Sequence, residues 1–336
     1  MVFQIILAGI LVKLPAGRML IAKVSDGVMQ VLSYGSEGIQ FVFGSLGVPS
    51  GPAGFIFAFQ TLANIVFISA LVGVLHYIGL LGFVVSKIGW VIGRLFKTSE
   101  VESFVAVANM FLGQTDSPIL VSKYLDFMTD SEVMLVLVSG MGSMSVSIIA
   151  GYTALGIPME SLLIASTLVP VGSIILSKIL LPQSEDLKEV GKVEIDRKGD
   201  NENVLDALAA GAIDGMNMAI GASLIAIISI VALVNGILGI FGLSLELILS
   251  YVFAPIGYLM GLESAEAIQA GELLGSKLIL NEFVAFGKLG TLIPDMNPRI
   301  ALMMAVALAG FANVSSIRYL YLRNFCPLPS QETYLG

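Results

Sequence analysis

The dominant pattern along the chain is a series of long apolar runs that contain no charged side chain. Three of these runs cover residues 51–86, 133–159 and 215–245. An α-helix needs about 20 apolar residues to cross the hydrocarbon core of a bilayer, so each run can hold a membrane span. The pattern therefore predicts an all-α polytopic membrane protein. Spans are expected at residues 55–80, 133–155, 159–181 and 205–241, with a further one starting near Arg299.

Other apolar segments carry charged side chains at intervals, which is typical of helices that lie in the membrane interface. Residues 19–34 include one basic and one acidic side chain, and residues 84–96 hold Trp90 between two basic side chains. Amphipathic helices bury their apolar face at the boundary between headgroups and acyl chains, where tryptophan is also enriched. Interfacial helices are therefore expected at both places, and residues 245–262 are expected to be partly interfacial.

Two stretches are apolar but are interrupted by polar residues at their centres. Residues 102–128 become polar over residues 113–118, and residues 264–292 contain several charged and amide side chains. Non-helical backbone at membrane depth is tolerated only inside protein or beside water. Each stretch is therefore predicted to be a re-entrant helical hairpin. Glu272 and Lys277 in the second stretch are poorly aligned for an ion pair, so a structural role is favoured for both.

The two interrupted stretches resemble each other. Residues 109–112 match residues 281–284 as Asn-x-Phe followed by an apolar residue. Each match is followed by a cluster of small polar residues, at 142–145 and at 313–316. Transporters built from inverted repeats show such weak internal similarity, with the binding site where the two broken segments meet. The sequence therefore predicts two inverted repeats that share one site.

The composition agrees with a membrane protein and narrows the classes of function. Of 336 residues, 12% are charged, whereas a soluble domain carries about a quarter. The net charge of −8 argues against a nucleic-acid partner, because phosphate binding needs a surplus of Lys and Arg. One cysteine, Cys326, and one histidine, His76, are present, and common catalytic motifs are lacking. We therefore expect neither an enzyme nor a bound cofactor.

Two carboxylates in apolar surroundings mark the candidate site. Asp116 follows Gln114 and Thr115 in the first hairpin, and Glu282 follows Asn281 in the second. A carboxylate at the bilayer centre costs roughly 2.5–3.5 kcal/mol on insertion scales, so such a residue is functional by default. Amide, hydroxyl and carboxylate groups together suit a ligand rich in hydroxyl and ring-nitrogen groups. The alternative, in which both acids cap the hairpin tips, stays open at this point.

Several separate motifs occur in the order found in one transporter family. They are Gly54-Phe55-Ile56-Phe57-Ala58-Phe59, Gly113-Gln114-Thr115, Ala150-Gly151-Tyr152, Asn281-Glu282-Phe283-Val284-Ala285-Phe286 and Gly310-Phe311-Ala312-Asn313-Val314-Ser315-Ser316. On these residues the chain resembles the concentrative nucleoside transporters, bacterial branch, up to about Ile317. The resemblance implies a homotrimer in the inner (plasma) membrane, in which a mobile transport domain slides against a scaffold.

The resemblance also implies roles for individual residues. The residues that match the family's nucleobase contacts are Gln114, Thr115, Asp116 and Ile148. Those that match its ribose contacts are Glu282, Asn313 and Ser316. Those that match its sodium ligands are Asn109, Leu112, Ser143 and Met144. The nucleoside would thus be held between the two hairpins and the spans that follow them.

Six segments follow from this reading. Residues 1–99 are expected to form N-terminal scaffold spans and interfacial helices, residues 100–181 the first hairpin with two spans, and residues 182–203 a hydrophilic loop. Residues 204–262 are expected to form a scaffold helix and interfacial segment, residues 263–317 the second hairpin with a span, and residues 318–336 an aberrant tail.

The chain departs from the family in three places. Asp116 replaces the usual Glu, the N-terminus starts inside the family's second span, and Arg318 and Arg323 interrupt what should be a further span. A chain with a tail of this kind is expected to transport nucleosides poorly or not at all.

The function that these observations predict is cation-coupled uptake of nucleosides. Polar ligands on Asn109 and Ser143 favour Na⁺, whereas a protonatable Asp116 or Glu282 could serve H⁺, so both ions remain candidates. The shorter Asp116 leaves more room at the base and favours purine nucleosides. Two rival functions are a non-transporting nucleoside-recognition or gate-type membrane protein and a membrane-embedded hydrolase. The hydrolase is disfavoured because neither carboxylate has an identifiable catalytic partner.

Overall fold

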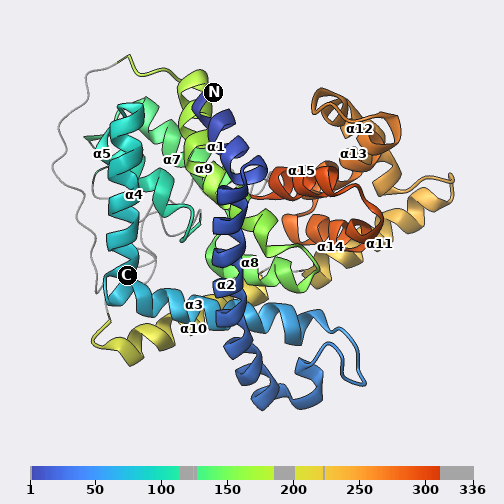
Figure 1. Ribbon diagram of the computed structural model, residues 1–336. Coiled ribbons are helices and arrows are strands. Elements are labelled where there is room, and N and C mark those ends of the chain that lie inside the picture. Colours follow the sequence, from blue (N-terminus) through green and yellow to red (C-terminus); the bar gives the residue numbers. More distant parts are fainter. Residues whose placement is uncertain (1, 114–123, 125–126, 185–200, 222–223, 311–336) are drawn as a thin grey trace, which may run out of the picture.

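The computed structural model describes residues 2–113, 124, 127–184, 201–221 and 224–310, and helices account for their regular structure (Figure 1). Three helical segments within these residues are long and apolar enough to cross a membrane, Ala58–Tyr77, Asp130–Ala154 and Met159–Leu180. The number rises to five if each of two sharply bent helix pairs counts as one span. The predicted all-α membrane fold is confirmed.

The chain begins with α1 (Val2–Lys13), which meets α2 (Pro15–Phe43) at a bend of 72°. Pro15 stands at the start of α2, where its missing N–H costs nothing because the first amides of a helix have no intrahelical partner. α2 extends beyond the interfacial helix predicted at residues 19–34 at both ends. Buried positions recur along it from Ile21 to Ile39. A short 3₁₀ turn, η1 (Gly44–Gly47), follows.

One of the next helices packs closely against a helix from a later part of the chain. A π-helical turn, η2 (Ala58–Leu62), leads into α3 (Ala63–Tyr77), and Gly79 then turns the chain into α4 (Leu80–Phe96). The helices predicted at residues 55–80 and 84–96 are thus present. α10 (Val204–Gly221) crosses α3 so closely that a β-carbon on Gly211 would lie 2.6 Å from the carbonyl oxygen of Ser69. Glycine is therefore required at this crossing.

The first repeat is described over α5 (Glu100–Ala108), α7 (Asp130–Gly142), α8 (Val146–Ala154) and α9 (Met159–Leu180). Both α5 and α7 begin with a capping box. Ser99 accepts from the backbone N–H of Glu102, and Thr129 accepts from that of Glu132, while each glutamate accepts in return from the N–H of its cap. These reciprocal bonds fix where the two helices start.

The last helices belong to two of the predicted segments. α11 (Leu224–Gly239) and α12 (Leu245–Leu259) fall in the predicted scaffold and interfacial segment. The predicted second repeat comprises α13 (Ser264–Ile279), α14 (Glu282–Leu292), the short η4 (Ile293–Asp295) and α15 (Pro298–Leu308). The helix predicted at residues 205–241 corresponds to α10 and α11, and residues 222–223 lie outside the described residues. The interrupted stretch predicted at residues 264–292 corresponds to α13 and α14.

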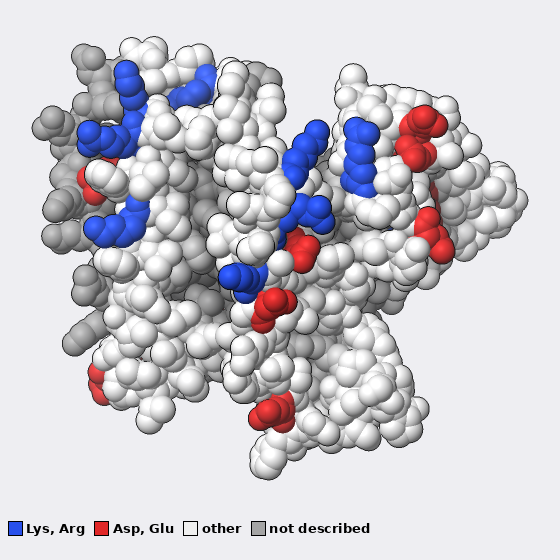
Figure 2. All heavy atoms as spheres, in the orientation of Figure 1, with Lys and Arg blue, Asp and Glu red and all other residues white. Residues whose placement is uncertain are grey.

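The surface of the molecule is largely uncharged. Figure 2 shows one face on which wide areas carry neither acidic nor basic side chains. Large apolar side chains are exposed on several helices, including Phe41 on α2, Ile225 on α11 and Leu259 on α12, each at least 87% exposed. Contiguous apolar surface of this extent marks contact with lipid or with other protein. In Figure 1, α4 and α5 lie on the side opposite α12 and α13, with α2, α8 and α9 between them.

Candidate functional site

The span predicted at residues 133–155 corresponds to Asp130–Ala154, and its helix is interrupted at residues 143–145. α7 ends at Gly142, Ser143 is extended, and Ser145 is the N-cap of α8 without using its side chain as a cap. A break of this kind leaves backbone groups at two helix ends without intrahelical partners. One of them, the N–H of Val146, donates to the carbonyl oxygen of Phe111, 3.0 Å away. The segment that follows α5 therefore packs into the break.

Asn109 and Ser143, both predicted sodium ligands, meet at this break. The side-chain amide of Asn109 donates to the hydroxyl of Ser139 at 2.8 Å, and its oxygen accepts from the hydroxyl of Ser143 at 3.5 Å. Ser143 also donates to the carbonyl oxygen of Gly140 at 3.1 Å. All three side chains are fully buried. Amide, hydroxyl and carbonyl oxygens are the ligands that hard cations prefer, so this group of atoms fits Na⁺ chemically.

The other two predicted sodium ligands lie in the same region. Leu112 and Met144 are buried, and their side chains are apolar. Only their main-chain carbonyls could serve a cation, in keeping with backbone ligands at a helix break. Ser145 was not predicted as a ligand, although it belongs to the small polar cluster. Its hydroxyl is buried and has no hydrogen-bond partner among the described residues.

In the second repeat, the break between α13 and α14 places Glu282 in the first turn of a helix. The side chain of Asn281 caps α14 by accepting from the N–H of Val284 at 2.9 Å. Glu282, the next residue, is 6% exposed. The N-cap itself is thus Asn281, and the charge of Glu282 in the first turn also suits the helix N-terminus. A buried carboxylate beside a break is available to bind a solute.

Lys277 and Glu272 do not pair with each other, in keeping with their poor alignment on a helix. The ammonium of Lys277 donates to the carbonyl oxygens of Ala307 at 3.0 Å and Ala309 at 3.2 Å, at the end of α15. Glu272 instead pairs with Lys288, 3.0 Å away. Lys277 also interacts electrostatically with Glu282. The predicted structural role of Glu272 agrees with this ion pair, whereas Lys277 lies next to the candidate site.

The end of α7 lies against the end of α15. Gly310 follows the last turn of α15 and has a φ of +105°, a conformation that favours glycine. A β-carbon on Gly310 would lie 2.8 Å from the carbonyl carbon and oxygen of Gly142. The last residue of α7 therefore touches the backbone just after α15, so the described residues of the two predicted repeats meet at this point.

Ile148, the predicted base contact, is buried in α8 one turn before an aromatic cluster. Tyr152 stacks on Phe286 of α14, with ring centres 4.2 Å apart, and lies 5.2 Å from the ring of Phe283. The hydroxyl of Tyr152 has no hydrogen-bond partner among the described residues. The cluster joins the second half of the first broken span to the helix that carries Glu282. Tyr152 was not predicted as a site residue, because a buried aromatic in an apolar run gives no sequence signal.

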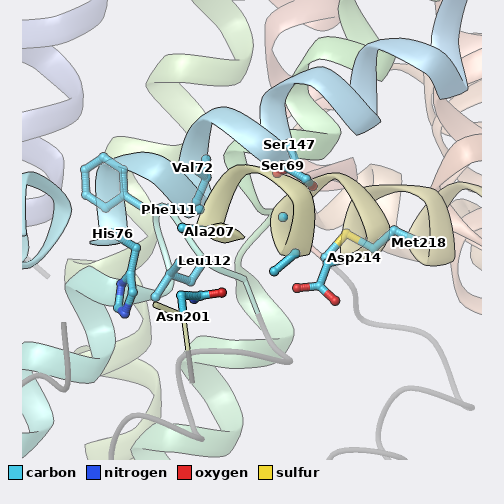
Figure 3. Close-up of a pocket in the computed structure, with 13 residues that line it drawn as sticks. Ser69, Val72, His76, Phe111, Leu112, Ser147, Asn201, Ala207, Asp214 and Met218 are labelled. Carbon is cyan, nitrogen blue, oxygen red and sulfur yellow. The ribbon is translucent and has the colours of Figure 1, made fainter. Parts of the chain in front are cut away.

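A cavity of about 250 Å³ lies beside the first hairpin (Figure 3). Its walls include Leu112 from the hairpin, Ser147 from α8, Ser69 from α3 and Asp214 from α10. It therefore separates the predicted scaffold helices from the first repeat. Figure 3 shows His76 at the end of the cavity away from Asp214. Asp214 was not predicted as a site residue, because a single acidic residue near the start of a helix is most simply explained as a favourable N-terminal charge.

Several predicted site residues lie outside the described residues. They are Gln114, Thr115, Asp116, Asn313 and Ser316. The same is true of residues 185–200 in the predicted hydrophilic loop and of residues 318–336 in the predicted tail. The described part of the site therefore consists of the sodium-ligand group, Ile148 and Glu282.

Comparisons with known proteins were made with this geometry in view. Three family profiles match consecutive parts of the chain: "Na+ dependent nucleoside transporter N-terminus" at residues 1–46, "Nucleoside recognition" at 58–159 and "Na+ dependent nucleoside transporter C-terminus" at 161–322. An uncharacterized transporter of Haemophilus influenzae is 39% identical, over 94% of this chain and 79% of the relative. A nucleoside permease of Helicobacter pylori is 36% identical, over 95% and 80%.

Solved structures give the same result. The structure of CNTnw in an inward-facing substrate-bound state has a TM-score of 0.89 and 35% identity, covering 95% of this chain and 80% of that one. A variant of CNTnw in an outward-facing state has a TM-score of 0.90 and 34% identity, covering 96% and 81%. Apolar helices long enough to cross a membrane, together with these relatives, define a membrane transport protein. The chain belongs to the concentrative nucleoside transporter family.

Proposed function

We propose that this protein imports nucleosides across the inner (plasma) membrane by alternating access, driven by a coupled cation. The observation that carries the proposal is the contact of Gly142 with Gly310, which brings the break beside Ser143 in the first repeat to the end of α15 in the second. Helix ends at such breaks supply unpaired N–H and C=O groups that suit a polar solute and a small cation. Solved relatives in inward- and outward-facing states support alternating access.

In this mechanism, residues 1–99 and 204–262 form the scaffold, and residues 100–181 and 263–317 form the moving transport unit. Close packing of α3 on α10 supports the scaffold assignment, because glycines let the two helices touch along their backbones. The cavity between α10 and the first hairpin lies between the two units. The loop at residues 182–203 joins them. We further propose that three copies assemble into a trimer around the scaffold.

The nucleoside would be recognised at both of its ends. Gln114, Thr115 and Asp116 supply amide, hydroxyl and carboxylate groups for the base edge, and Ile148 supplies an apolar surface for the ring. The sugar hydroxyls would be bound by three residues of the second repeat, Glu282, Asn313 and Ser316. A charge-assisted hydrogen bond from a ribose hydroxyl to a buried carboxylate is about twice as strong as a neutral one. The shorter Asp116 should favour the larger purine bases.

The coupled cation would bind at the first break, between Asn109 and Ser143, with main-chain oxygens at Leu112 and Met144. The oxygen groups around Ser143 support Na⁺ over H⁺, because amides and hydroxyls do not take up a proton near neutral pH. Binding of Na⁺ there would fix the first hairpin against the break. Solute and cation would then bind the same state of the transporter, which is what couples uptake to the ion gradient.

A non-transporting nucleoside-recognition protein is the second candidate, because a profile with that description matches residues 58–159. Transporter profiles flank this match on both sides, at residues 1–46 and 161–322, and they favour the carrier. The membrane-embedded hydrolase has no support from the relatives, which include nucleoside permeases and cotransporters.

Uptake of labelled nucleosides into proteoliposomes tests the proposal. Purified protein is reconstituted, and uridine, adenosine and inosine are each offered under an inward Na⁺ gradient, an inward H⁺ gradient or neither. We expect saturable uptake of unmodified nucleoside that depends on one of the two gradients, with Na⁺ favoured. Saturable binding without uptake would favour the recognition protein, and chemical change of the nucleoside would favour an enzyme.

A further inference from the structure

Lys277 is a buried cation that the site described above does not use. Its side chain is 7% exposed and lies near the end of α13. The ammonium reaches across to α15 and donates to the carbonyl oxygens of Ala307 and Ala309. A buried ammonium is strongly unfavourable unless nearby groups compensate its charge. Its placement against two carbonyls therefore calls for a reason beyond packing.

The end of α15 is a natural place for a cation. The last carbonyl groups of a helix have no intrahelical partner and together carry a partial negative charge. Here the helix stops at Leu308, and Gly310 turns the backbone away. The carbonyls of Ala307 and Ala309 thus point at a position that would otherwise need a cation or water. Lys277 fills that position from within the chain.

The first repeat has a comparable contact, made from a different position, since Asn109 matches Asn281 rather than Lys277 in the internal repeat. There, Asn109 at the end of α5 reaches the end of α7 through Ser139 and Ser143. In both repeats, the first helix of the interrupted stretch thus presents a polar side chain to the C-terminal end of a neighbouring helix, α7 or α15. These two helix ends also touch, through Gly142 and Gly310.

We infer that the ammonium of Lys277 is a tethered cation, which takes in the second repeat the place that the coupling cation takes in the first. The inference rests on the proposed function, because it assumes that a cation binds at the break beside Ser143. Because Lys277 permanently neutralises the partial negative charge at the end of α15, the transporter needs a single external cation for each nucleoside. Lys277 and Glu282 also carry opposite charges that attract each other within the second interrupted stretch.

The test compares the sodium dependence of nucleoside binding in three purified, monodisperse variants. Lys277→Met keeps the length of the side chain but removes its charge, and Lys277→Arg keeps the charge. Lys288→Met is the matched control, because Lys288 lies in the same repeat but pairs with Glu246 and Glu272. The readouts are the Hill coefficient for Na⁺ and the Na⁺ concentration that restores nucleoside binding.

We expect the unmodified protein, Lys277→Arg and Lys288→Met to show a Hill coefficient near one. Lys277→Met should bind nucleoside about tenfold more weakly at low Na⁺, because the variant loses one charge-assisted contact. High Na⁺ should restore its affinity with a Hill coefficient well above one, since Na⁺ then also fills the vacated position. An unchanged sodium dependence in Lys277→Met, or a loss that no Na⁺ concentration restores, would overturn the inference.

The charge moved per nucleoside in the unmodified protein provides a second test that needs no variant. It is obtained from the membrane potential at which uptake of a neutral nucleoside stops. The inference predicts one charge for each nucleoside, and two charges would overturn it. Nucleoside binding that depends on no cation at all would instead contradict the proposed coupling, so the two failures are distinguishable.

Discussion

Glu102, at the start of α5, forms a partly buried ion pair with Lys178, near the end of α9. The carboxylate is 1% exposed, and its second oxygen accepts from the N–H of Ser99 in the capping box. Lys178 also donates to the hydroxyl of Ser131 at 2.9 Å. Glu102 thus fixes the start of α5, and its partner Lys178 joins that start to α9 and α7. The first hairpin is therefore anchored at the end opposite its polar break.

Glu102→Gln should weaken this anchor without removing the helix cap, because glutamine also serves in a capping box. We expect a loss of about 1–3 kcal/mol in unfolding free energy, the range for a hydrogen bond to a charged group. Glu132→Gln is the matched control, since Glu132 has the same place in the capping box of α7. Thermal unfolding in detergent measures both. Equal melting temperatures for the two variants would show that the ion pair with Lys178 adds nothing.

Gly310→Ala should damage the contact between the end of α7 and the end of α15. A β-carbon at this position would lie 2.8 Å from backbone atoms of Gly142, and the φ of +105° is itself unfavourable for alanine. Strain and overpacking together should cost about 2–6 kcal/mol. Gly287→Ala is the control, because a β-carbon on Gly287 meets nothing within 4 Å. Thermal stability and nucleoside binding should fall in the first variant and hold in the second.

Ser143→Ala should weaken cation binding more than nucleoside recognition. The variant removes a hydroxyl oxygen beside Asn109, and we expect about tenfold lower affinity for Na⁺, the effect of losing one ligand worth about 1.4 kcal/mol. Nucleoside affinity at saturating Na⁺ should be nearly unchanged. Ser177→Ala is a close control, since that hydroxyl is also buried and donates to the carbonyl of Ile174 three residues earlier. Equal sodium affinities in both variants would argue against Ser143 as a ligand.

Glu282→Gln keeps the shape of the side chain and removes the charge that strengthens hydrogen bonds to sugar hydroxyls. Nucleoside affinity should fall roughly tenfold or more, whereas free nucleobases should bind weakly to both forms. Glu272→Gln serves as the control, because Glu272 pairs with Lys288 and lies 34% exposed. Competition binding with nucleosides and their bases measures the effect. A nucleoside affinity that Glu282→Gln leaves intact would remove this residue from the site.

The sequence predicted the helical fold well, because charge-free runs such as residues 133–159 leave few options in a membrane. It also located the break between α13 and α14, because polar side chains such as Asn281 and Glu282 are costly in an apolar run. It did not reveal the break after Gly142, since small polar residues also occur inside continuous helices. Nor did it find the partner of Lys277, because a main-chain carbonyl 30 residues away has no side-chain signal. Individual ligand roles came from the family resemblance.

The central claim is that nucleoside and cation bind one state of this protein together. The most direct test is a pair of equilibrium titrations on purified protein: nucleoside binding at increasing Na⁺, and Na⁺ binding at increasing nucleoside, with choline replacing Na⁺ at constant ionic strength. Linkage requires that each ligand raise the affinity for the other by the same factor, typically 5–150-fold. We predict such a reciprocal increase. Two affinities that do not depend on the other ligand would contradict cation coupling in this protein.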